Sequence, residues 1–351
     1  MSRFRIIMWG EFPPNTHNGI SVSNKMIFDI LQDQFRDIAV VEENAWNKKF
    51  VGKIIHFIKN YFRVSAYLLK NKNGILYFNL PLSTAGLFRL LIFLPVARMI
   101  KTKNMRFLAH LHRGDLRVFY NKKLIHRIFL ELAFFCIDEI IVLSNLFIED
   151  IKIVNKRVTT RILHNTSEIE GNGIIQKEYT GNFICLSNYI ESKGIRELVD
   201  CFKSDELKGL TLSIYGNIYD QSFFNELVCD KTGNVNLNHG INRNDIINIL
   251  RNFDALVLPS PNEGQPIVIL EAISIGMPVI ANYTGDIPNM LGRDYKFLAI
   301  PQNKDSLLSK IKQFDQYEIK DEISDYLYSR YKENYSNRIY EGSVREIFKR
   351  L

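Results

Sequence analysis

Two glutamates, Glu263 and Glu271, stand eight residues apart in a segment that passes from an apolar run through a loop into a helical pattern. Residues 255–259 form the apolar run and predict a buried strand that meets a loop. Gly276 and Pro278 predict the end of the helix, because glycine supplies a left-handed cap and proline forbids continuation. The eight-residue spacing of the two glutamates is by itself weak evidence for a functional site. A carboxylate at Glu271 among apolar neighbours needs a hydrogen-bonding partner, however.

The loop before this helix has the features of an anion site. Gly264 and Gln265 offer backbone amides, and Pro266 is expected as the first helical residue, where a missing N–H is tolerated. Because the first N–H groups of a helix have no partner within it, its N-terminus suits a phosphate. A further apolar run from Pro278 predicts a strand–helix–strand unit and a parallel sheet, whose ligands bind beyond the carboxyl ends of the strands.

Length and composition describe a globular protein of more than one domain. The 351 residues exceed a usual single core, so two domains are expected. The four cysteines are scattered and form no Cys-x-x-Cys pair, which favours a reducing cytoplasm and argues against structural zinc. The longest apolar run, at 90–97, is too short to span a bilayer.

Charge is distributed unevenly along the chain. Residues 1–170 carry 25 Lys and Arg against 14 Asp and Glu, whereas the remainder carries 20 against 24. Residues 44–114 contain 13 basic side chains and no acidic one. A solvated basic surface would explain this, but the interleaved aromatic residues favour an anionic membrane surface or a polyanionic acceptor. The aromatic residues concerned are Phe57, Tyr61, Phe62, Phe88 and Phe93.

The first half reads as a series of strands and helices. A strand at 4–9 leads into a loop, 10–21, that contains Gly19, and a helix at 85–101 is expected to break near Pro95. A strand at 106–113 places His110 and His112 on one face by alternation. A strand histidine is more often a core residue, which suits His110, but the position of His112 at the carboxyl end favours a functional role.

The motif around the two glutamates resembles a known donor-site signature. Residues 259–281 read Pro-Ser-x-x-Glu-Gly-x-Pro-x-x-x-x-Glu-Ala-x-x-x-Gly-x-Pro-Val-Ile-Ala, which is similar to glycosyltransferase family 4 (glycosyl transferases group 1), retaining enzymes of the GT-B fold. The resemblance implies an α/β chain of two Rossmann-like, doubly wound domains facing across a cleft. The acceptor-binding domain would be 1–168 and the nucleotide-sugar-binding domain 169–335, with a linker near 166–180 and a C-terminal helix, 336–351, crossing back to the first domain.

The resemblance also implies roles for individual residues. Glu271 would hold the nucleotide ribose hydroxyls, and Glu263 would contact the sugar together with the amides of Gly264 and Gln265. Lys193, in a Glu-Ser-Lys-Gly string, would bind the diphosphate, and His112 would lie beside the reacting sugar. The expected catalytic residues are Glu263, His112 and Lys193. The expected donor-binding residues are Gly19, Asn188, Lys193, Glu263, Gly264, Gln265, Pro266 and Glu271.

Three positions depart from the family pattern. Asn188 stands where the family has arginine, Thr166 stands where it has glycine, and Gly19 is all that remains of a Gly-Gly pair. A catalytically impaired nucleotide-sugar-binding protein of the same fold therefore stays open as an alternative. A nucleic-acid binder is a second alternative, supported by the basic segment alone, since the chain has no recognised nucleic-acid module.

The function implied is that of a retaining hexosyltransferase. It would move a sugar from a nucleoside-diphosphate sugar to a glycan or polyprenyl-diphosphate-linked acceptor, in the synthesis of bacterial surface polysaccharide such as O-antigen, capsule or lipopolysaccharide. The leaving phosphate itself would take the acceptor proton, so no metal or other cofactor is expected, and the chain contains no Asp-x-Asp metal motif. The expected location is the cytoplasm, with an anionic membrane surface as a further partner and no nucleic acid.

Overall fold

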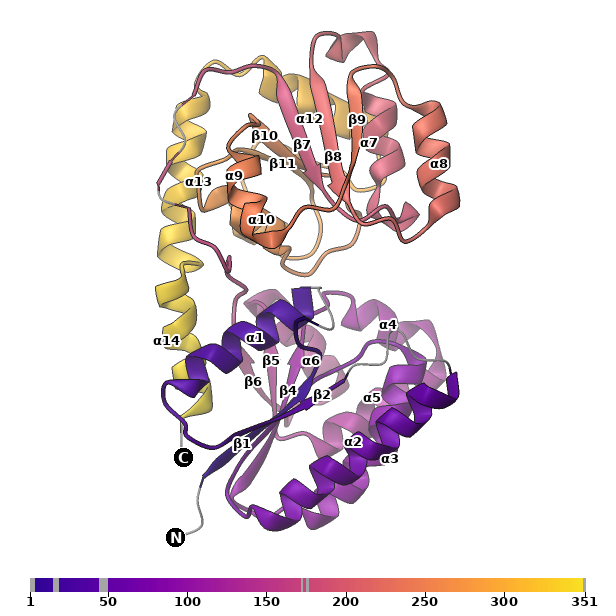
Figure 1. Cartoon of the computed structure of the whole chain (residues 1–351), viewed down its shortest axis with the longest axis vertical. Coiled ribbons are helices and arrows are strands. Elements are labelled where there is room, and N and C mark those ends of the chain that lie inside the picture. Colours follow the sequence, from indigo (N-terminus) through magenta and orange to yellow (C-terminus); the bar gives the residue numbers. More distant parts are fainter. Residues whose placement is uncertain (1–3, 15–18, 44–49, 172, 175–176, 350–351) are drawn as a thin grey trace. The chain divides into compact units, whose positions relative to one another are not determined.

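The chain folds into two compact α/β units, which Figure 1 shows in a computed structural model. The structure describes residues 4–14, 19–43, 50–171, 173–174 and 177–349. One unit comprises Met1–His164 with Tyr340–Leu351, and the other comprises Asn165–Ile339. Each contains a six-stranded sheet in which neighbouring strands run parallel. The expected α/β class of two doubly wound domains is thereby confirmed.

The sheet of the first unit has the strand order β2-β1-β3-β4-β5-β6. Its strands are β1 (Arg5–Gly10), β2 (Ile38–Glu42), β3 (Gly74–Asn79), β4 (Met105–Leu111), β5 (Glu139–Val142) and β6 (Thr159–Ile162). Because β2 and β3 lie on opposite sides of β1, the direction of winding reverses between β1 and β3. In doubly wound sheets the carboxyl ends beside such a reversal are where ligands bind.

Helices cover both faces of this sheet (Figure 1). They are α1 (Gly19–Gln32), α2 (Phe50–Lys70), α3 (Thr84–Ile100), α4 (Leu116–Lys122), α5 (Leu124–Cys136), α6 (Ile148–Val154) and α14 (Asn337–Phe348). Side chains alternate between the two faces of the sheet along β1, so two separate cores form. On one face Ile7 and Trp9 pack with residues of α2, α3 and α5. On the other face Ile6 and Met8 pack with α1 and with α14 from Tyr340 onward.

The expected break of α3 at Pro95 is wrong, because the helix continues to Ile100. Pro95 removes one backbone donor, which would leave the carbonyl of Leu91 without its helical partner. Pro95 lies on the exposed side of the helix, where water can reach that carbonyl. The start of α3 is fixed by an N-cap residue, Ser83, whose hydroxyl accepts a hydrogen bond from the Gly86 amide at 3.1 Å.

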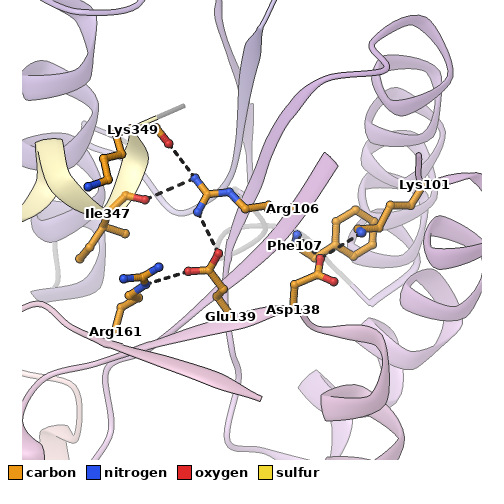
Figure 2. A network of polar contacts seen from close by, with 8 residues as sticks. All are labelled: Lys101, Arg106, Phe107, Asp138, Glu139, Arg161, Ile347 and Lys349. Atoms are coloured by element: carbon orange, nitrogen blue, oxygen red, sulfur yellow. Dashed lines mark hydrogen bonds and ion pairs between the residues drawn. The ribbon is translucent and has the colours of Figure 1, made fainter. Parts of the chain in front are cut away.

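The C-terminal end of α14 is fastened to the first unit through Arg106, at the amino end of β4 (Figure 2). The Arg106 guanidinium donates to the carbonyls of Ile347, at 3.4 Å, and Lys349, at 3.0 Å. It also donates to Oε1 of Glu139 at 2.8 Å. The last carbonyls of a helix have no partner within it, so this contact satisfies them with a cation, which the helix dipole favours.

The sheet of the second unit has the order β12-β11-β10-β7-β8-β9. Its strands are β7 (Asn182–Leu186), β8 (Thr211–Gly216), β9 (Val235–His239), β10 (Ala255–Leu258), β11 (Val279–Asn282) and β12 (Leu298–Ala299). The winding reverses between β7 and β10, so the loops that follow these two strands are the expected ligand-binding loops of this unit.

The helices of the second unit are α7 (Ile195–Cys201), α8 (Gln221–Asp230), α9 (Ile246–Leu250), α10 (Ile267–Ile273), α11 (Ile287–Leu291), α12 (Lys304–Asp315) and α13 (Lys320–Asn334). The expected cap of α10 is confirmed, since Gly276 has a φ of +69° and Met277 N donates to Ala272 O at 2.9 Å. Pro266, however, is the residue before the helix, with a ψ of 124°, and not its first helical residue.

The expected linker near 166–180 begins as packed structure. Asn165, Thr166 and Ser167 are buried within the second unit, and the Thr166 hydroxyl donates to the Tyr335 carbonyl. The polar side chains that suggested a linker are therefore satisfied by internal hydrogen bonds. None of the helices in the described part of the chain has both the length and the apolar character needed to cross a bilayer.

Candidate functional site

An ion pair joins the two loops at the reversal point of the second sheet. Lys193 ends the short 3-10 helix η2 (Glu191–Lys193), which follows β7, whereas Glu263 lies in the loop after β10. The Lys193 Nζ lies 2.7 Å from Glu263 Oε1, with side-chain exposures of 33% and 15%. Two of the expected catalytic residues, seventy positions apart in the sequence, are thus brought together. The pair is open enough to solvent for a ligand to reach it.

The glycine after Lys193 explains how these loops come so close. Gly194 has a φ of +73°, which favours glycine. A Cβ added there would lie 2.4 Å from the Pro259 carbonyl oxygen, at the end of β10. The turn that carries Lys193 therefore packs directly against the backbone that leads to Glu263, and a larger residue would separate them.

The loop after β10 is supported by the loop after β11. The Asp286 amide donates to the Gly264 carbonyl at 2.9 Å, and Gln265 Nε2 donates to Asp286 Oδ2 at 2.7 Å. A Cβ on Gly285 would lie 1.9 Å from the Glu263 carbonyl, so the two backbones are in direct contact. The buried Gln265 side chain therefore serves as an internal tie. The expected contact of a ligand with the Gln265 backbone amide stays a prediction.

Glu271, a buried residue of α10, is paired with Arg243, a residue that the sequence did not predict as part of the site. Its side chain is 7% exposed, and its Oε1 accepts from Nη2 of Arg243 at 3.1 Å. Arg243 also pairs with Glu168, with 3.0 Å between Nε and Oε2. Burial raises the pKa of Glu271, while the Arg243 charge opposes that rise. The partner that a buried carboxylate requires is therefore Arg243 in this structure.

Arg243 could have been suspected only from its position. It opens the short helix η4 (Arg243–Asp245), four residues beyond the carboxyl end of β9, where ligand-binding loops occur in such sheets. No motif marks it. Its approach to Glu271 follows from the contact between α9 and α10, which are distinct elements of the second unit.

Asn188, which replaces the family arginine, takes part in a local hydrogen bond. It lies two residues beyond β7, and its Oδ1 accepts from the Asn217 amide at 3.1 Å. This contact ties the loops that follow β7 and β8. The side chain therefore has a structural partner, and the site of the second unit contains Lys193 without the second cation of the family pattern.

Two expected site residues, Gly19 and His112, belong to the first unit. Gly19 is exposed and begins α1. His112 directly follows β4 and is partly exposed, with its Nε2 3.0 Å from Nδ2 of Asn79. Its ring lies against that of the fully buried His110, at 3.8 Å between centroids. Loss of hydration lowers the pKa of both histidines well below the usual value, so both rings are neutral.

The described residues contain no group of three or more His, Cys, Asp or Glu side chains placed to hold a metal ion. The expectation of a metal-free reaction stays a prediction.

Comparisons with known proteins bear on the second unit most directly. Residues 172–333 match the family model for glycosyl transferases group 1. TuaC of Bacillus subtilis (strain 168), assigned by its name to teichuronic acid biosynthesis as a glycosyltransferase, is 34% identical over 76 residues, which are 21% of this chain and 20% of that protein. A UDP-Gal:alpha-D-GlcNAc-diphosphoundecaprenol alpha-1,3-galactosyltransferase of Escherichia coli is 53% identical over 45 residues, 12% of each chain.

A similar solved structure covers nearly the whole chain. Sucrose-phosphate synthase (tll1590) from Thermosynechococcus elongatus superposes with a TM-score of 0.77 over 99% of this chain and 98% of that one, at 13% identity. This likeness and the two doubly wound units define the GT-B fold. The segment that matches the family model, 172–333, lies within the second unit, which we call the group 1 domain for that match.

Proposed function

We propose that the protein is a retaining glycosyltransferase of family 4 that transfers a sugar from a nucleoside-diphosphate sugar to a glycan or polyprenyl-diphosphate-linked acceptor. The observation that carries this proposal is the Lys193–Glu263 pair, 2.7 Å apart, in the loops after β7 and β10 of the group 1 domain. A cation and a carboxylate at a reversal point suit the two parts of such a donor. Lysine suits its diphosphate, and the carboxylate suits its sugar hydroxyls.

Lys193 has its main effect on departure of the nucleotide. Negative charge grows on the diphosphate as the bond to the sugar breaks, and a fixed ammonium stabilises that charge. In the structure described here, Glu263 holds the ammonium at 2.7 Å. A bound diphosphate competes for Lys193 and leaves Glu263 to accept hydrogen bonds from the sugar. The supporting loop after β11 keeps the Gly264 and Gln265 amides in place for the same ligand.

The Glu271 carboxylate accepts hydrogen bonds from the two ribose hydroxyls of the nucleotide. A carboxylate has room for several donors, so it can hold Arg243 and a ribose together. The Arg243 charge lowers the pKa of the buried carboxyl and so opposes the effect of burial, and Glu168 pairs with Arg243. This arrangement gives the nucleotide a charged acceptor in an otherwise apolar part of the helix.

In the transfer itself, the bond between the anomeric carbon and the leaving phosphate oxygen breaks. The acceptor oxygen forms the new bond on the same face of the sugar, and the leaving phosphate takes the acceptor proton. His112 lies beside the reacting sugar. No metal is required in this scheme, so EDTA is expected to leave turnover unchanged; loss of turnover that magnesium or manganese restores would contradict it.

The names of two relatives support the choice of acceptor. The Escherichia coli relative is named for an acceptor on diphosphoundecaprenol, and the Bacillus subtilis relative is named for teichuronic acid biosynthesis. Their matched stretches cover 12% and 20% of their lengths. We therefore infer a role in bacterial surface polysaccharide synthesis, with lipopolysaccharide among the products considered.

The direct experiment incubates the protein with UDP-, GDP- and ADP-sugars and a set of polyprenyl-diphosphate-linked sugars. Release of nucleoside diphosphate measures turnover, and NMR of the product gives the anomeric configuration. The proposal predicts a product with the configuration of the donor. A product of opposite configuration would exclude the retaining mechanism.

A second candidate, a binding protein of impaired activity, is favoured by one observation. Asn188 stands in place of a phosphate-binding arginine and is engaged with the Asn217 amide. Such a protein would bind a nucleotide sugar without turning it over with any acceptor of the set. Saturable donor binding together with turnover would exclude it.

We also propose that an anionic membrane surface is a partner of the first unit. The helices α2, α3 and α5 pack side by side on one face of the sheet (Figure 1). They expose many large apolar side chains. An exposed apolar surface on neighbouring helices favours an interaction with a partner. The side chains are Val51, Ile54, Ile55, Ile58, Phe62, Leu69, Phe88, Ile92, Val96, Met99, Leu124, Ile125, Ile128, Leu132 and Phe135.

Four exposed cations accompany this apolar surface and match it to anionic lipid. Lys53, Lys59, Arg63 and Lys70 lie along α2, and none forms an ion pair with a described residue. Each cation near an anionic surface contributes about 1 kcal/mol. Three of the five aromatic residues first assigned to this face pack into the core instead. Phe93 is fully buried, and the rings of Phe57 and Tyr61 lie against core rings, with centroid distances of 6.3 Å to Trp9 and 5.3 Å to Phe93.

Co-sedimentation with vesicles tests this surface. Binding to vesicles that contain phosphatidylglycerol is expected at low salt, and screening should weaken it at high salt. Changing Lys53, Lys59, Arg63 and Lys70 to Glu should release the protein while leaving donor binding unchanged. The matched control makes the same change at four exposed cations elsewhere, Lys156, Arg157, Lys208 and Lys304. A wild type that ignores anionic vesicles, or equal release by both variants, would reject the surface.

A further inference from the structure

A chain of hydrogen bonds at the reversal point of the first sheet starts from a backbone carbonyl. The Asn24 side chain, from α1, donates through Nδ2 to the Glu11 carbonyl at 2.9 Å and to Asn79 Oδ1 at 2.8 Å. A carbonyl oxygen only accepts, so this contact fixes which end of the Asn24 amide carries hydrogen. Both Nδ2 hydrogens are then used, and Oδ1 of Asn24 is an acceptor.

The orientation of Asn79 follows from that of Asn24. Because Asn79 Oδ1 accepts from Asn24, its Nδ2 carries the two hydrogens. One points to Asn24 Oδ1 at 3.1 Å and the other to Nε2 of His112 at 3.0 Å. An amide hydrogen that meets a ring nitrogen requires a lone pair on that nitrogen. The Nε2 of His112 is therefore unprotonated.

The same reasoning applies to His110. The Tyr77 hydroxyl lies 2.8 Å from Asn24 Oδ1, which cannot donate, so the tyrosine must donate its one hydrogen there. The Nδ1 of His110, also 2.8 Å from that hydroxyl, must then supply the hydrogen of their contact. The buried Nε2 of His110 has no hydrogen-bond partner in the described structure, which agrees with its being the unprotonated nitrogen.

A glycine leaves room for the two amides. A Cβ on Gly10, the last residue of β1, would lie 2.4 Å from Asn79 Oδ1 and 2.7 Å from Asn24 Nδ2. Gly10, Asn79 and His112 stand at or just past the carboxyl ends of β1, β3 and β4, which are adjacent strands. The chain of bonds therefore occupies the position where a doubly wound sheet binds its ligand.

From this geometry we propose that Asn79, oriented by Asn24, is a positioning residue that fixes His112 in the neutral form with its proton on Nδ1. His112 then acts as a hydrogen-bond donor through Nδ1–H. The described residues make no hydrogen bond to that nitrogen, and the ring is partly exposed. The group that receives this bond is an oxygen of the sugar-bearing substrate, an identification that rests on the proposed function. In this role His112 takes no proton from the acceptor.

The form of the imidazole can be measured in the free protein. With ¹⁵N-labelled histidine, long-range proton–nitrogen NMR distinguishes a protonated ring nitrogen from an unprotonated one, and a His112→Asn variant assigns the signals. The proposal predicts a protonated Nδ1 and an unprotonated Nε2 for His112. Protonation on Nε2 would overturn it, whatever the outcome of nucleotide-sugar assays. In Asn79→Asp, whose carboxylate accepts, the proton is expected to move to Nε2.

A pair of variants of equal size tests the donor role in turnover. His112→Asn can still donate from about the position of Nδ1, whereas His112→Asp can only accept. The asparagine variant is expected to retain at least about tenfold more turnover than the aspartate variant, the equivalent of one hydrogen bond. Equal donor affinity in both would show that the group 1 domain is intact. An aspartate variant as active as the asparagine variant would overturn the donor role.

Discussion

The carboxyl ends of the two sheets carry different chemistry at equivalent topological positions. In the second unit, this end of the sheet has two ion pairs: Lys193 with Glu263 joins the loops after β7 and β10, and Arg243, beyond β9, pairs with Glu271 of α10. In the first unit, neutral amides, a phenol and two imidazoles, carried by α1, β3, β4 and the residue after β4, are joined by hydrogen bonds. The same fold has thus produced a charged site in one unit and a neutral site in the other.

The difference indicates which part of a substrate each site suits. A partly exposed ion pair contributes about 0–1 kcal/mol, so a charged ligand can exchange with one of its partners at little cost. A buried neutral network keeps its donors and acceptors in fixed orientations, which suits uncharged hydroxyl groups. We therefore assign the diphosphate to Lys193 of the second unit, and the recognition of a further, uncharged oxygen of the substrate to His112 of the first. The following variants test that assignment.

Loss of the lysine should have the largest effect. Lys193→Ala is expected to lower kcat by about 100-fold or more, because charge on the leaving group grows toward the transition state. Donor affinity should fall less than turnover does. Single-turnover kinetics separate the two effects, and Lys203→Ala, which removes a lysine paired with Asp200 and Asp230, is the control. A single-turnover rate equal to that of the wild type would contradict the assigned role.

Glu271→Gln keeps the size of the side chain and removes its charge. We expect donor affinity to fall by about 1.5–3 kcal/mol, as for a hydrogen bond to a charged group. Calorimetric titration measures the change, with the exposed Glu206→Gln as control. Unchanged donor affinity would remove Glu271 from the site.

The same residue gives the donor site its expected pH dependence. Burial raises the pKa of Glu271, so its carboxyl takes up a proton at a higher pH than an ordinary glutamate does. Donor affinity should fall as the pH drops toward that raised pKa, because the protonated form loses its acceptor charge. In Glu271→Gln this part of the pH dependence should disappear. Its persistence in the variant would assign the titration to another group.

The neutral network of the first unit predicts an effect on stability. Gly10→Ala would place a Cβ 2.4 Å from Asn79 Oδ1, and relief of that overlap is expected to destabilise the protein by about 1–3 kcal/mol. Gly342→Ala in α14 meets nothing within 4 Å and should stabilise the helix slightly. Thermal unfolding followed by circular dichroism compares them. Equal midpoints would mean that the network tolerates a methyl group.

The smallest expected effect is a gain. Asn188→Arg restores a cation but loses the hydrogen bond from the Asn217 amide. A charged contact to the phosphate exceeds the lost neutral hydrogen bond by about 1 kcal/mol. Donor affinity should therefore rise roughly fivefold. Titration of wild type and variant with the same donor measures it. No gain would mean that position 188 does not face the phosphates.

Much of the candidate site of the second unit could be predicted from the sequence, because most of its residues lie in one continuous segment of the chain. The strand, loop and helix around Glu263 follow from apolar runs, proline and glycine, and the family motif spans the same residues. The structure adds the reason for the glycine after Lys193, which is the close approach of Pro259. Pro266 was predicted one position too far into the helix. Proline fits both the first helical residue and the residue before it, because neither position donates a hydrogen bond within the helix.

The missed features depend on which elements become neighbours. Arg243 reaches Glu271 through the contact of α9 with α10, and no local pattern encodes that pairing. The hydrogen bonds that link Asn24 to Asn79, and Asn79 to His112, likewise join α1, the end of β3 and the residue after β4. Phe93 was assigned to the surface from its spacing. It belongs instead to the buried stripe of α3, together with Leu90, Leu94 and Ala97.

The most direct test of the central claim is a titration of the wild type and Lys193→Ala with UDP-, GDP- and ADP-sugars, followed by thermal unfolding. Ligand that binds the folded state raises the apparent stability by about 2.7 kcal/mol at a hundred times Kd. We predict that one class of nucleotide sugar raises the midpoint of the wild type in a concentration-dependent way, and raises that of Lys193→Ala less at equal concentration. Equal stabilisation of both proteins, or stabilisation of neither by any of the donors, would contradict the account.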